Sequence, residues 1–345
     1  MRHLIDFTDL SEREWQHIYR RFEEIYEHPG DYRDALRGQT LASLFYEPST
    51  RTRLSFEAAM LKLGGGVFGF SDPAASSVSK GETLKDTVIM TSGYANVLTL
   101  RHPREGAAMA ASLYSSVPVI NAGDGGHCHP TQTLTDLVTL RRLRGSVEGL
   151  RVCVCGDLKY GRTAHSLLRA LARFEGIRAV LVSAPELSLP EYVKRTCGAI
   201  KLDEQPDLRT AIGDVDVLYM TRLQRERFRD PAEYERLKGR YTLTPEILSG
   251  APSDLLVMHP LPRAGEISEA VDGDPRAVYF QQARYGMFAR MALLLELCSL
   301  PPFAVKEAEP QGVHRCDNGS CITKTEPYLP VFEGSACRYC EQQNN

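Results

Sequence analysis

Short apolar runs of strand length alternate along this chain with segments of helical periodicity, and this alternation restricts the possible folds more than any other feature. The runs lie at residues 40–46, 97–100, 117–120, 151–155, 215–220 and 255–258. Helical patterns follow, for example after Ser49 and from Pro130 onward. Parallel strands need such crossover helices, so the alternation predicts parallel sheets that are covered on both faces. The expected fold class is α/β, with doubly wound parallel sheets.

Local signals delimit two helices near the N-terminus. Ser11 and Glu14 form a capping-box pattern, which predicts a helix start. The apolar residues that follow at helical spacing are Trp15, Ile18, Phe22 and Ile25. A second helix is predicted between Ser49 and Gly64, because glycines stop helices. Its apolar residues at helical spacing are Leu54, Ala58 and Leu61.

The length of 345 residues suggests two domains, each with a full core. A break is expected near residues 140–150, where a basic segment precedes a new strand. We therefore expect a first domain over residues 1–140, completed by a helix at 286–304. A second domain is expected over residues 141–285, and a linker with a small module over 305–345.

Charge and hydropathy exclude several classes of protein. With 41 Lys and Arg against 44 Asp and Glu, the net charge of −3 argues against a general nucleic-acid binder. The longest apolar runs are too short for a membrane span, which needs about 20 residues. At the N-terminus, Asp6 interrupts any signal-peptide core. We expect a cytoplasmic enzyme with neither nucleic acid nor membrane as a partner.

Cationic and hydroxyl side chains gather where the predicted strands end. The segment Ser49–Arg53 offers hydroxyls, guanidinium groups and backbone N–H groups at a helix start, which suits a phosphate or phosphonate. A helix cap with two surface arginines would have the same pattern. Arg101 ends another strand, and Ser76 and Lys80 share a nearby loop. Because open parallel sheets bind ligands at this edge, we favour an anion site.

The segment Gly156–Thr163 comes close to a nucleotide-binding phosphate loop but differs at one position. Arg162 stands where that loop needs a lysine, and its planar guanidinium suits a carboxylate better. Arg222 and Gln224 follow another predicted strand. Two arginines for two carboxylates indicate a dicarboxylic substrate.

An imidazole and a carboxamide occupy one further turn. His129 directly precedes a predicted helix and Gln132 lies in its first turn, so both could contact a carbonyl or amide group at the sheet edge. His127 and Cys128 make a metal site conceivable, but no wider ligand set supports it.

Taken together, these motifs resemble the catalytic chain of the aspartate carbamoyltransferases. The matching segments, in the order of the family, are Phe45–Arg53, Arg101–Pro103, His129–Gln132, Gly156–Thr163 and His259–Arg263. The resemblance covers about residues 1–304. Ornithine carbamoyltransferases share the first motif but typically have cysteine where this chain has Thr131 and Pro260.

The resemblance implies the transcarbamoylase fold, a role in de novo pyrimidine biosynthesis, no organic cofactor and the following site residues. Those at the carbamoyl phosphate site are Ser49, Thr50, Arg51, Thr52 and Arg101. Ser76 and Lys80 would come from the adjacent subunit of a homotrimer; Ser77 and Ser79 leave the choice of serine open. Thr52, Arg101 and His129 would contact the carbamoyl oxygen, and Gln132 would position the nitrogen. Residues implied for L-aspartate are Arg162, Arg222 and Gln224, with Leu261 and Pro262 where the two substrates meet.

Four cysteines crowd into the C-terminal segment as two pairs, Cys316 with Cys321 and Cys337 with Cys340. This spacing predicts a structural tetrathiolate zinc site, one zinc per chain, in a small β module. The segment resembles the zinc domain of the bacterial regulatory chain, without the nucleotide-binding domain that precedes it there. Such a module could support a higher assembly of trimers.

Two alternative functions remain open at this stage. One is a related transcarbamoylase with another amine acceptor, which the paired arginines disfavour. The other is a non-catalytic scaffold, which would need at least one broken site motif. No carboxylate or other side chain stands out as a general base, so the departing phosphate is expected to take the proton. None of the matched site residues lies beyond Arg263, so the chemistry is expected to be independent of the tail.

Overall fold

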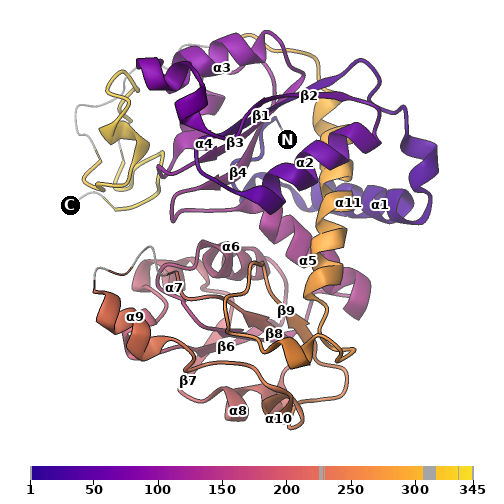
Figure 1. Cartoon of the computed structure of the whole chain (residues 1–345), viewed down its shortest axis with the longest axis vertical. Coiled ribbons are helices and arrows are strands. Elements are labelled where there is room, and N and C mark those ends of the chain that lie inside the picture. The colour runs from indigo at the N-terminus through magenta and orange to yellow at the C-terminus, as the bar shows by residue number, and fades with distance from the viewer. Residues whose placement is uncertain (1, 225–227, 229, 306–315, 333, 344–345) are drawn as a thin grey trace. The chain divides into compact units, whose positions relative to one another are not determined.

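The computed structural model describes residues 2–224, 228, 230–305, 316–332 and 334–343 (Figure 1). The chain divides into two compact units. The first comprises residues 1–134 with 286–345, and the second comprises residues 135–285. Each unit contains one sheet. In the part of the chain that the structure describes, no helix is both long enough and apolar enough to cross a bilayer.

The sheet of the first unit has the strand order β2-β1-β3-β4, and all neighbouring strands are parallel. Its strands are β1 (Thr40–Phe45), β2 (Gly66–Phe70), β3 (Val97–His102) and β4 (Val119–Asp124). Its helices are α1 (Glu12–Glu27), α2 (Thr50–Lys62), α3 (Leu84–Ser92) and α4 (Ala107–Ser112). Phe45 pairs with Arg101, so β1 and β3 end side by side.

The second unit contains a parallel sheet of order β7-β6-β5-β8-β9. Its strands are β5 (Arg151–Cys155), β6 (Arg178–Val182), β7 (Lys201–Gln205), β8 (Val217–Met220) and β9 (Leu256–Met258). Its helices are α6 (Arg162–Leu171), α7 (Glu191–Thr196), α8 (Leu208–Ala211), α9 (Pro231–Leu237) and α10 (Pro245–Leu248). The chain passes between the units in α5 (Pro130–Arg144) and α11 (Tyr279–Cys298).

The predicted class of two parallel α/β sheets is confirmed, and so are the six predicted strands, with ends that shift by a few residues. The capping box is also confirmed, since Glu14 N–H donates to Ser11 Oγ and Ser11 N–H donates to Glu14 Oε2. Three strands, β2, β6 and β7, were not predicted. In the case of β7 the reason is physical, because this exposed strand is mostly polar and has no apolar run.

Helix α2 begins at Thr50 as predicted, but its expected apolar face is turned outward. Leu54 and Leu61 are 50% and 61% exposed, whereas Phe56, Ala59 and Met60 are buried. The helix has apolar residues on more than one side, so spacing alone could not select the buried face.

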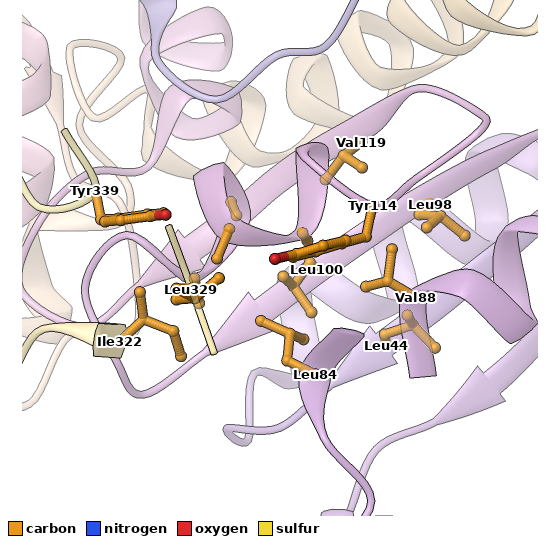
Figure 2. Close-up of a cluster of buried hydrophobic side chains, with 14 of the residues drawn as sticks. Leu44, Leu84, Val88, Leu98, Leu100, Tyr114, Val119, Ile322, Leu329 and Tyr339 are labelled. Atoms are coloured by element: carbon orange, nitrogen blue, oxygen red, sulfur yellow. The ribbon is translucent and has the colours of Figure 1, made fainter. Parts of the chain in front are cut away.

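The C-terminal tail, residues 316–332 and 334–343, packs on the first unit. Ile322, Leu329 and Tyr339 join the buried cluster that also contains Leu84 and Leu100 (Figure 2). Among its described residues, the tail contains a 3-10 turn at Ile322–Lys324 and isolated bridges, and no β-strand. The expected small β module is therefore not seen in these residues: the tail shares the core of the first unit.

Candidate active site

The first unit places the N-terminus of α2 at the edge where β1 ends. Ser49 is the cap residue of this helix, yet its hydroxyl does not cap the helix. Thr50 and Arg51 are exposed, and Thr52 is half-buried in the first turn. The first-turn N–H groups of a helix have no partner within the helix, so this edge favours an anion.

Arg101 is a buried arginine at the end of β3. Its Nη1 donates to the carbonyl oxygen of Ala122 at 3.1 Å, and its Nη2 lies 3.1 Å from Glu47 Oε2. Glu47 is a partner that the sequence alone did not identify, although it lies within the first motif. A buried guanidinium whose orientation is fixed in this way can donate a hydrogen bond to a further anion or to a polarised carbonyl oxygen.

The ring of His129 converges with Arg101 beside Gly123. A Cβ atom at Gly123 would lie 2.5 Å from Arg101 Nη1 and 3.3 Å from His129 Cδ2. His129 is buried, and its Nδ1 accepts the backbone N–H of Gln132 at 3.4 Å. Its proton is therefore assigned to Nε2, which can donate to a carbonyl oxygen. Two predicted site residues are thus brought together, and Gly123 has room for no side chain.

Ser76 and Lys80 lie on a loop that precedes α3. The Ser76 hydroxyl caps the 3-10 turn Ser77–Lys80 by accepting the Val78 N–H, and it donates to the Pro73 carbonyl. Lys80 is exposed, and no carboxylate within 4.0 Å of its ammonium is found in the described part of the chain. The loop therefore presents a cation to the surface of the unit.

In the second unit, two loops meet at the ends of the neighbouring strands β5 and β8. The Gln224 carboxamide donates to the Tyr160 carbonyl at 2.6 Å, so it ties the loop after β8 to the loop that leads to Arg162. Arg162 is the first residue of α6, and Arg222 lies on the same loop as Gln224.

Asp157 is a buried carboxylate that the sequence analysis did not single out. It accepts the N–H groups of Tyr160 at 2.9 Å and Gln224 at 3.4 Å. Burial raises the pKa of Asp157 above its usual value, and these hydrogen bonds and Arg222 offset only part of that rise. Asp157 therefore holds both loops at the strand ends. The Gly-Asp pair after an apolar strand was the signal that could have identified it.

The loop with Leu261 and Pro262 is fixed by a buried histidine. His259 Nδ1 accepts the Leu261 N–H at 2.7 Å, and its Nε2 lies 2.6 Å from Glu266 Oε1. Burial raises the pKa of Glu266, but the hydrogen bond and electrostatic attraction from His259, together with backbone N–H donors such as that of Ala264, outweigh burial and leave the pKa below its usual value. The His259 N–H donates to Gln282 Oε1, which connects the loop to α11.

Four buried thiols come together in the tail. The sulfur atoms of Cys316, Cys321, Cys337 and Cys340 all lie within 4.8 Å of one another. The sulfur atoms of Cys316 and Cys340 are 3.5 Å apart, and those of Cys321 and Cys337 are 3.8 Å apart. With zinc–sulfur bonds of about 2.3 Å, a tetrahedron of thiolates has edges of about 3.8 Å. The donor set and its spacing fit zinc.

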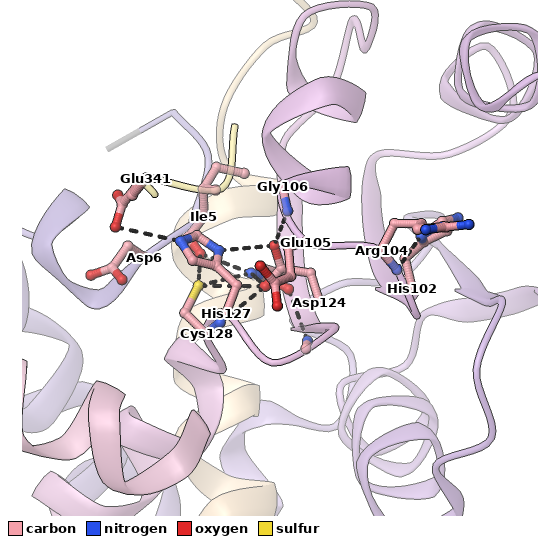
Figure 3. Close-up of polar contacts among 12 residues, drawn as sticks. Ile5, Asp6, His102, Arg104, Glu105, Gly106, Asp124, His127, Cys128 and Glu341 are labelled. Atoms are coloured by element: carbon pink, nitrogen blue, oxygen red, sulfur yellow. Dashed lines mark hydrogen bonds and ion pairs between the residues drawn. The ribbon is translucent and has the colours of Figure 1, made fainter. Parts of the chain in front are cut away.

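Asp124, His127 and Cys128 also lie close enough to hold a metal. However, the Asp124 carboxylate already accepts from the Gly106 N–H at 2.7 Å and from the Asn121 amide at 3.0 Å (Figure 3). Burial raises the pKa of the Cys128 thiol. These three residues therefore form a buried hydrogen-bonded cluster. Their contacts give no further support to a metal site here.

Comparison with known proteins gives consistent matches over most of the chain. The family model described as "Aspartate/ornithine carbamoyltransferase, carbamoyl-P binding domain" matches residues 2–142. The model of the corresponding "Asp/Orn binding domain" matches residues 148–297. The aspartate carbamoyltransferase catalytic subunit of Clostridium novyi is 54% identical over 298 residues, which are 86% of this chain and 97% of that relative. Neither family model reaches the tail.

Solved structures resemble the same part of the chain. The catalytic subunit of M. jannaschii aspartate transcarbamoylase has 48% identity and a TM-score of 0.81, covering 87% of this chain and 98% of its own. The Trypanosoma cruzi enzyme, solved in complex with carbamoyl phosphate and aspartate, has 38% identity and a TM-score of 0.82. It covers 86% of this chain and 96% of its own.

Proposed function

The chain belongs to the aspartate/ornithine carbamoyltransferase family and is an aspartate carbamoyltransferase, and we propose how its residues divide this reaction. Carbamoyl phosphate and L-aspartate give N-carbamoyl-L-aspartate and phosphate, in the cytoplasm, as a step of pyrimidine biosynthesis. The observation that carries the proposal is the convergence of the Arg101 guanidinium and the His129 ring beside Gly123. A carbonyl oxygen that gains negative charge is stabilised by such a pair of donors.

The first unit binds carbamoyl phosphate in this proposal. The phosphate is held by the N-terminus of α2 and by the side chains of Ser49, Thr50, Arg51, Thr52 and Arg101. The carbamoyl oxygen accepts from Thr52, Arg101 and His129, and Gln132 positions the carbamoyl nitrogen. Orientation of this anion accounts for a large part of the expected rate enhancement.

The second unit binds L-aspartate in this proposal. Arg162 and Arg222 each bind one carboxylate of the substrate. Gln224 holds the two loops that carry these arginines together, and it also contacts the substrate. Leu261 and Pro262 line the point where the substrates meet. The aspartate amine attacks the carbamoyl carbon, the bond from this carbon to the phosphate oxygen breaks, and phosphate leaves with a proton of the amine.

The choice of acceptor can be tested with purified protein and carbamoyl phosphate. L-aspartate is expected to be carbamoylated and L-ornithine is not, because two arginines repel a cationic side chain.

Arg222→Ala is expected to raise the half-saturation concentration for aspartate at least about tenfold, because the variant loses one charge-assisted hydrogen bond to the substrate. Binding of carbamoyl phosphate should stay unchanged.

The matched control is Arg209→Ala, which removes an exposed arginine of the same unit. Steady-state kinetics with each substrate varied in turn would decide the question. An equal loss for both substrates in Arg222→Ala would contradict the assignment of aspartate to the second unit.

We further propose a homotrimer in which Ser76 and Lys80 complete the site of the adjacent subunit. Exposed apolar residues on the first unit support this: Leu54 and Leu61 on α2, Ile89 and Met90 on α3, and Tyr94 after it. Several large apolar side chains left exposed on one unit are consistent with an interface between subunits. The exposed Lys80 on its loop is available to a neighbouring chain.

Mixing two inactive variants tests this sharing of sites. Lys80→Ala subunits and Arg51→Ala subunits are each expected to be inactive alone. Hybrid trimers should recover activity, because some of their sites combine an intact Arg51 with an intact Lys80. Absence of recovery, with subunit exchange verified by native mass spectrometry, would contradict a shared site.

The four tail cysteines are proposed to hold one structural zinc. Zinc bound by four thiolates has no open position, so it supplies folding energy and no chemistry. No step of the reaction passes through it, and no organic cofactor is required. The tail would also be available for a higher assembly of trimers.

A further inference from the structure

The tail forms backbone hydrogen bonds with the segment that directly follows β3. The Glu105 N–H donates to the Ser320 carbonyl at 3.0 Å, and the Ile322 N–H donates to the Glu105 carbonyl at 2.9 Å. The carboxylate of Glu105 accepts from the Asn318 amide at 2.7 Å. This segment continues from the strand end that carries Arg101. The tail is therefore hydrogen-bonded to the segment that directly follows Arg101, a proposed site residue.

The same carboxylate packs against the loop between β4 and α5. A Cβ atom at Gly125 would lie 2.7 Å from Glu105 Cγ, and one at Gly126 would lie 3.1 Å from Glu105 Oε1. This loop leads to His129. Glu105 is thus enclosed between the tail and a second segment that carries a proposed site residue.

A histidine makes a second link from the tail to this loop. His127 Nδ1 lies 3.1 Å from Asp124 Oδ2, and its Nε2 lies 3.4 Å from Glu341 Oε2 of the tail (Figure 3). His127 is therefore held between the end of β4 and the tail.

A third contact lies at the start of α3. The Tyr328 hydroxyl accepts the Lys85 N–H at 2.9 Å, and Glu326 Oε1 accepts the Leu84 N–H at 3.4 Å. Burial and the hydrogen bond to Glu326 raise the pKa of the Tyr328 phenol, so this group stays neutral. The first turn of α3 directly follows the loop that carries Lys80. Tail side chains thus satisfy N–H groups that the helix itself leaves without acceptors.

We propose that the tail holds the segments bearing Lys80, Arg101 and His129 in their working positions, with Tyr328 and Asn318 as positioning residues. These two residues touch no reacting group in the proposed mechanism. They act through the first turn of α3 and through Glu105. This inference rests on the proposed function, and it revises the expectation that the chemistry is independent of the tail.

Tyr328→Phe is the sharpest test, because it removes one hydroxyl and retains the ring that packs near Tyr114. Two measurements apply to the full chain with its metal: hydrogen–deuterium exchange, and steady-state kinetics. Exchange is expected to quicken over residues 77–92 and to stay unchanged over α6. The half-saturation for carbamoyl phosphate should rise about fivefold to tenfold, as for one lost hydrogen bond, with kcat unchanged. Tyr192→Phe, at an exposed tyrosine, is the control.

Hybrid trimers locate the effect in the subunit that provides Lys80. In a competent hybrid site, Lys80 comes from an Arg51→Ala subunit and Arg51 comes from a Lys80→Ala subunit. Tyr328→Phe should weaken carbamoyl phosphate binding when it is introduced into the Arg51→Ala subunit, which provides Lys80. It should have a smaller effect in the Lys80→Ala subunit. Hybrids without Tyr328→Phe serve as reference, and their failure to recover activity would reject the shared site alone.

The exchange measurement decides the positioning role without reference to shared sites. Unchanged exchange over residues 77–92 in Tyr328→Phe would overturn the inference, whatever the hybrids show. An equal rise in half-saturation for both substrates, or a loss of bound zinc, would also overturn it, because the effect would then be general destabilisation.

Discussion

Replacing Arg101 by alanine is expected to lower kcat/KM at least about a hundredfold, because the variant removes a donor aimed at the developing oxyanion. The guanidinium is buried, so water cannot replace its hydrogen bonds at low cost. It is also held in direction by the Ala122 carbonyl and by Glu47. Little reorganisation is therefore needed when the substrate binds.

Steady-state kinetics with both substrates varied would measure this loss. Arg37→Ala is the control, since that arginine is exposed and pairs with Asp34, three residues earlier in the sequence. Arg101→Lys should fall between the two, because an ammonium keeps the charge but loses the planar fork. Thermal unfolding would separate a lost contact from a lost fold. A kcat/KM of Arg101→Ala within about threefold of the unchanged protein would contradict the assignment.

Metal analysis of the purified protein is expected to give one zinc per chain, and removal of the metal should release the tail. Four buried thiols lie within 4.8 Å of one another, with one pair at 3.5 Å and another at 3.8 Å, and such a cluster is the donor set that a zinc ion binds. A segment this short buries too little surface to fold alone, so metal binding supplies much of its folding energy. Chelation should expose Ile322 and Leu329, and it should make the tail sensitive to proteases.

Cys337→Ser is the corresponding variant, and Cys298→Ala is its control at a buried cysteine outside the cluster. Turnover should persist at saturating carbamoyl phosphate, because none of the proposed reacting residues lies in the tail. Less than about half an equivalent of zinc under reducing conditions would contradict the metal site. So would full retention of zinc in Cys337→Ser.

Features set by local interactions could be predicted from the sequence. The Ser11–Glu14 capping box and the buried strands β1, β3 and β5 follow from neighbouring residues and from apolar runs. The exposed edge strand β7 could not be predicted in this way, because its register comes from β6 and not from its own composition.

Features set by contacts between distant segments could not be predicted. Glu105 and Asn318 are far apart in the sequence, and neither stands in a motif. The pairing of Glu47 with Arg101, and the role of Asp157 between two loops, likewise depend on which strands become neighbours. Candidate site residues at strand ends could be proposed from the sequence, because parallel sheets bring those ends to one edge.

The docking of the tail beside Glu105 has a consequence for how the protein responds to dilution. Docking joins two parts of one polypeptide, so its equilibrium is set by an effective local concentration and not by the amount of protein in solution. A zinc domain on a separate chain would leave its partner once both are diluted below the dissociation constant of the pair. Here every molecule keeps its own copy within reach at any concentration, and only loss of metal or a broken contact can separate the two.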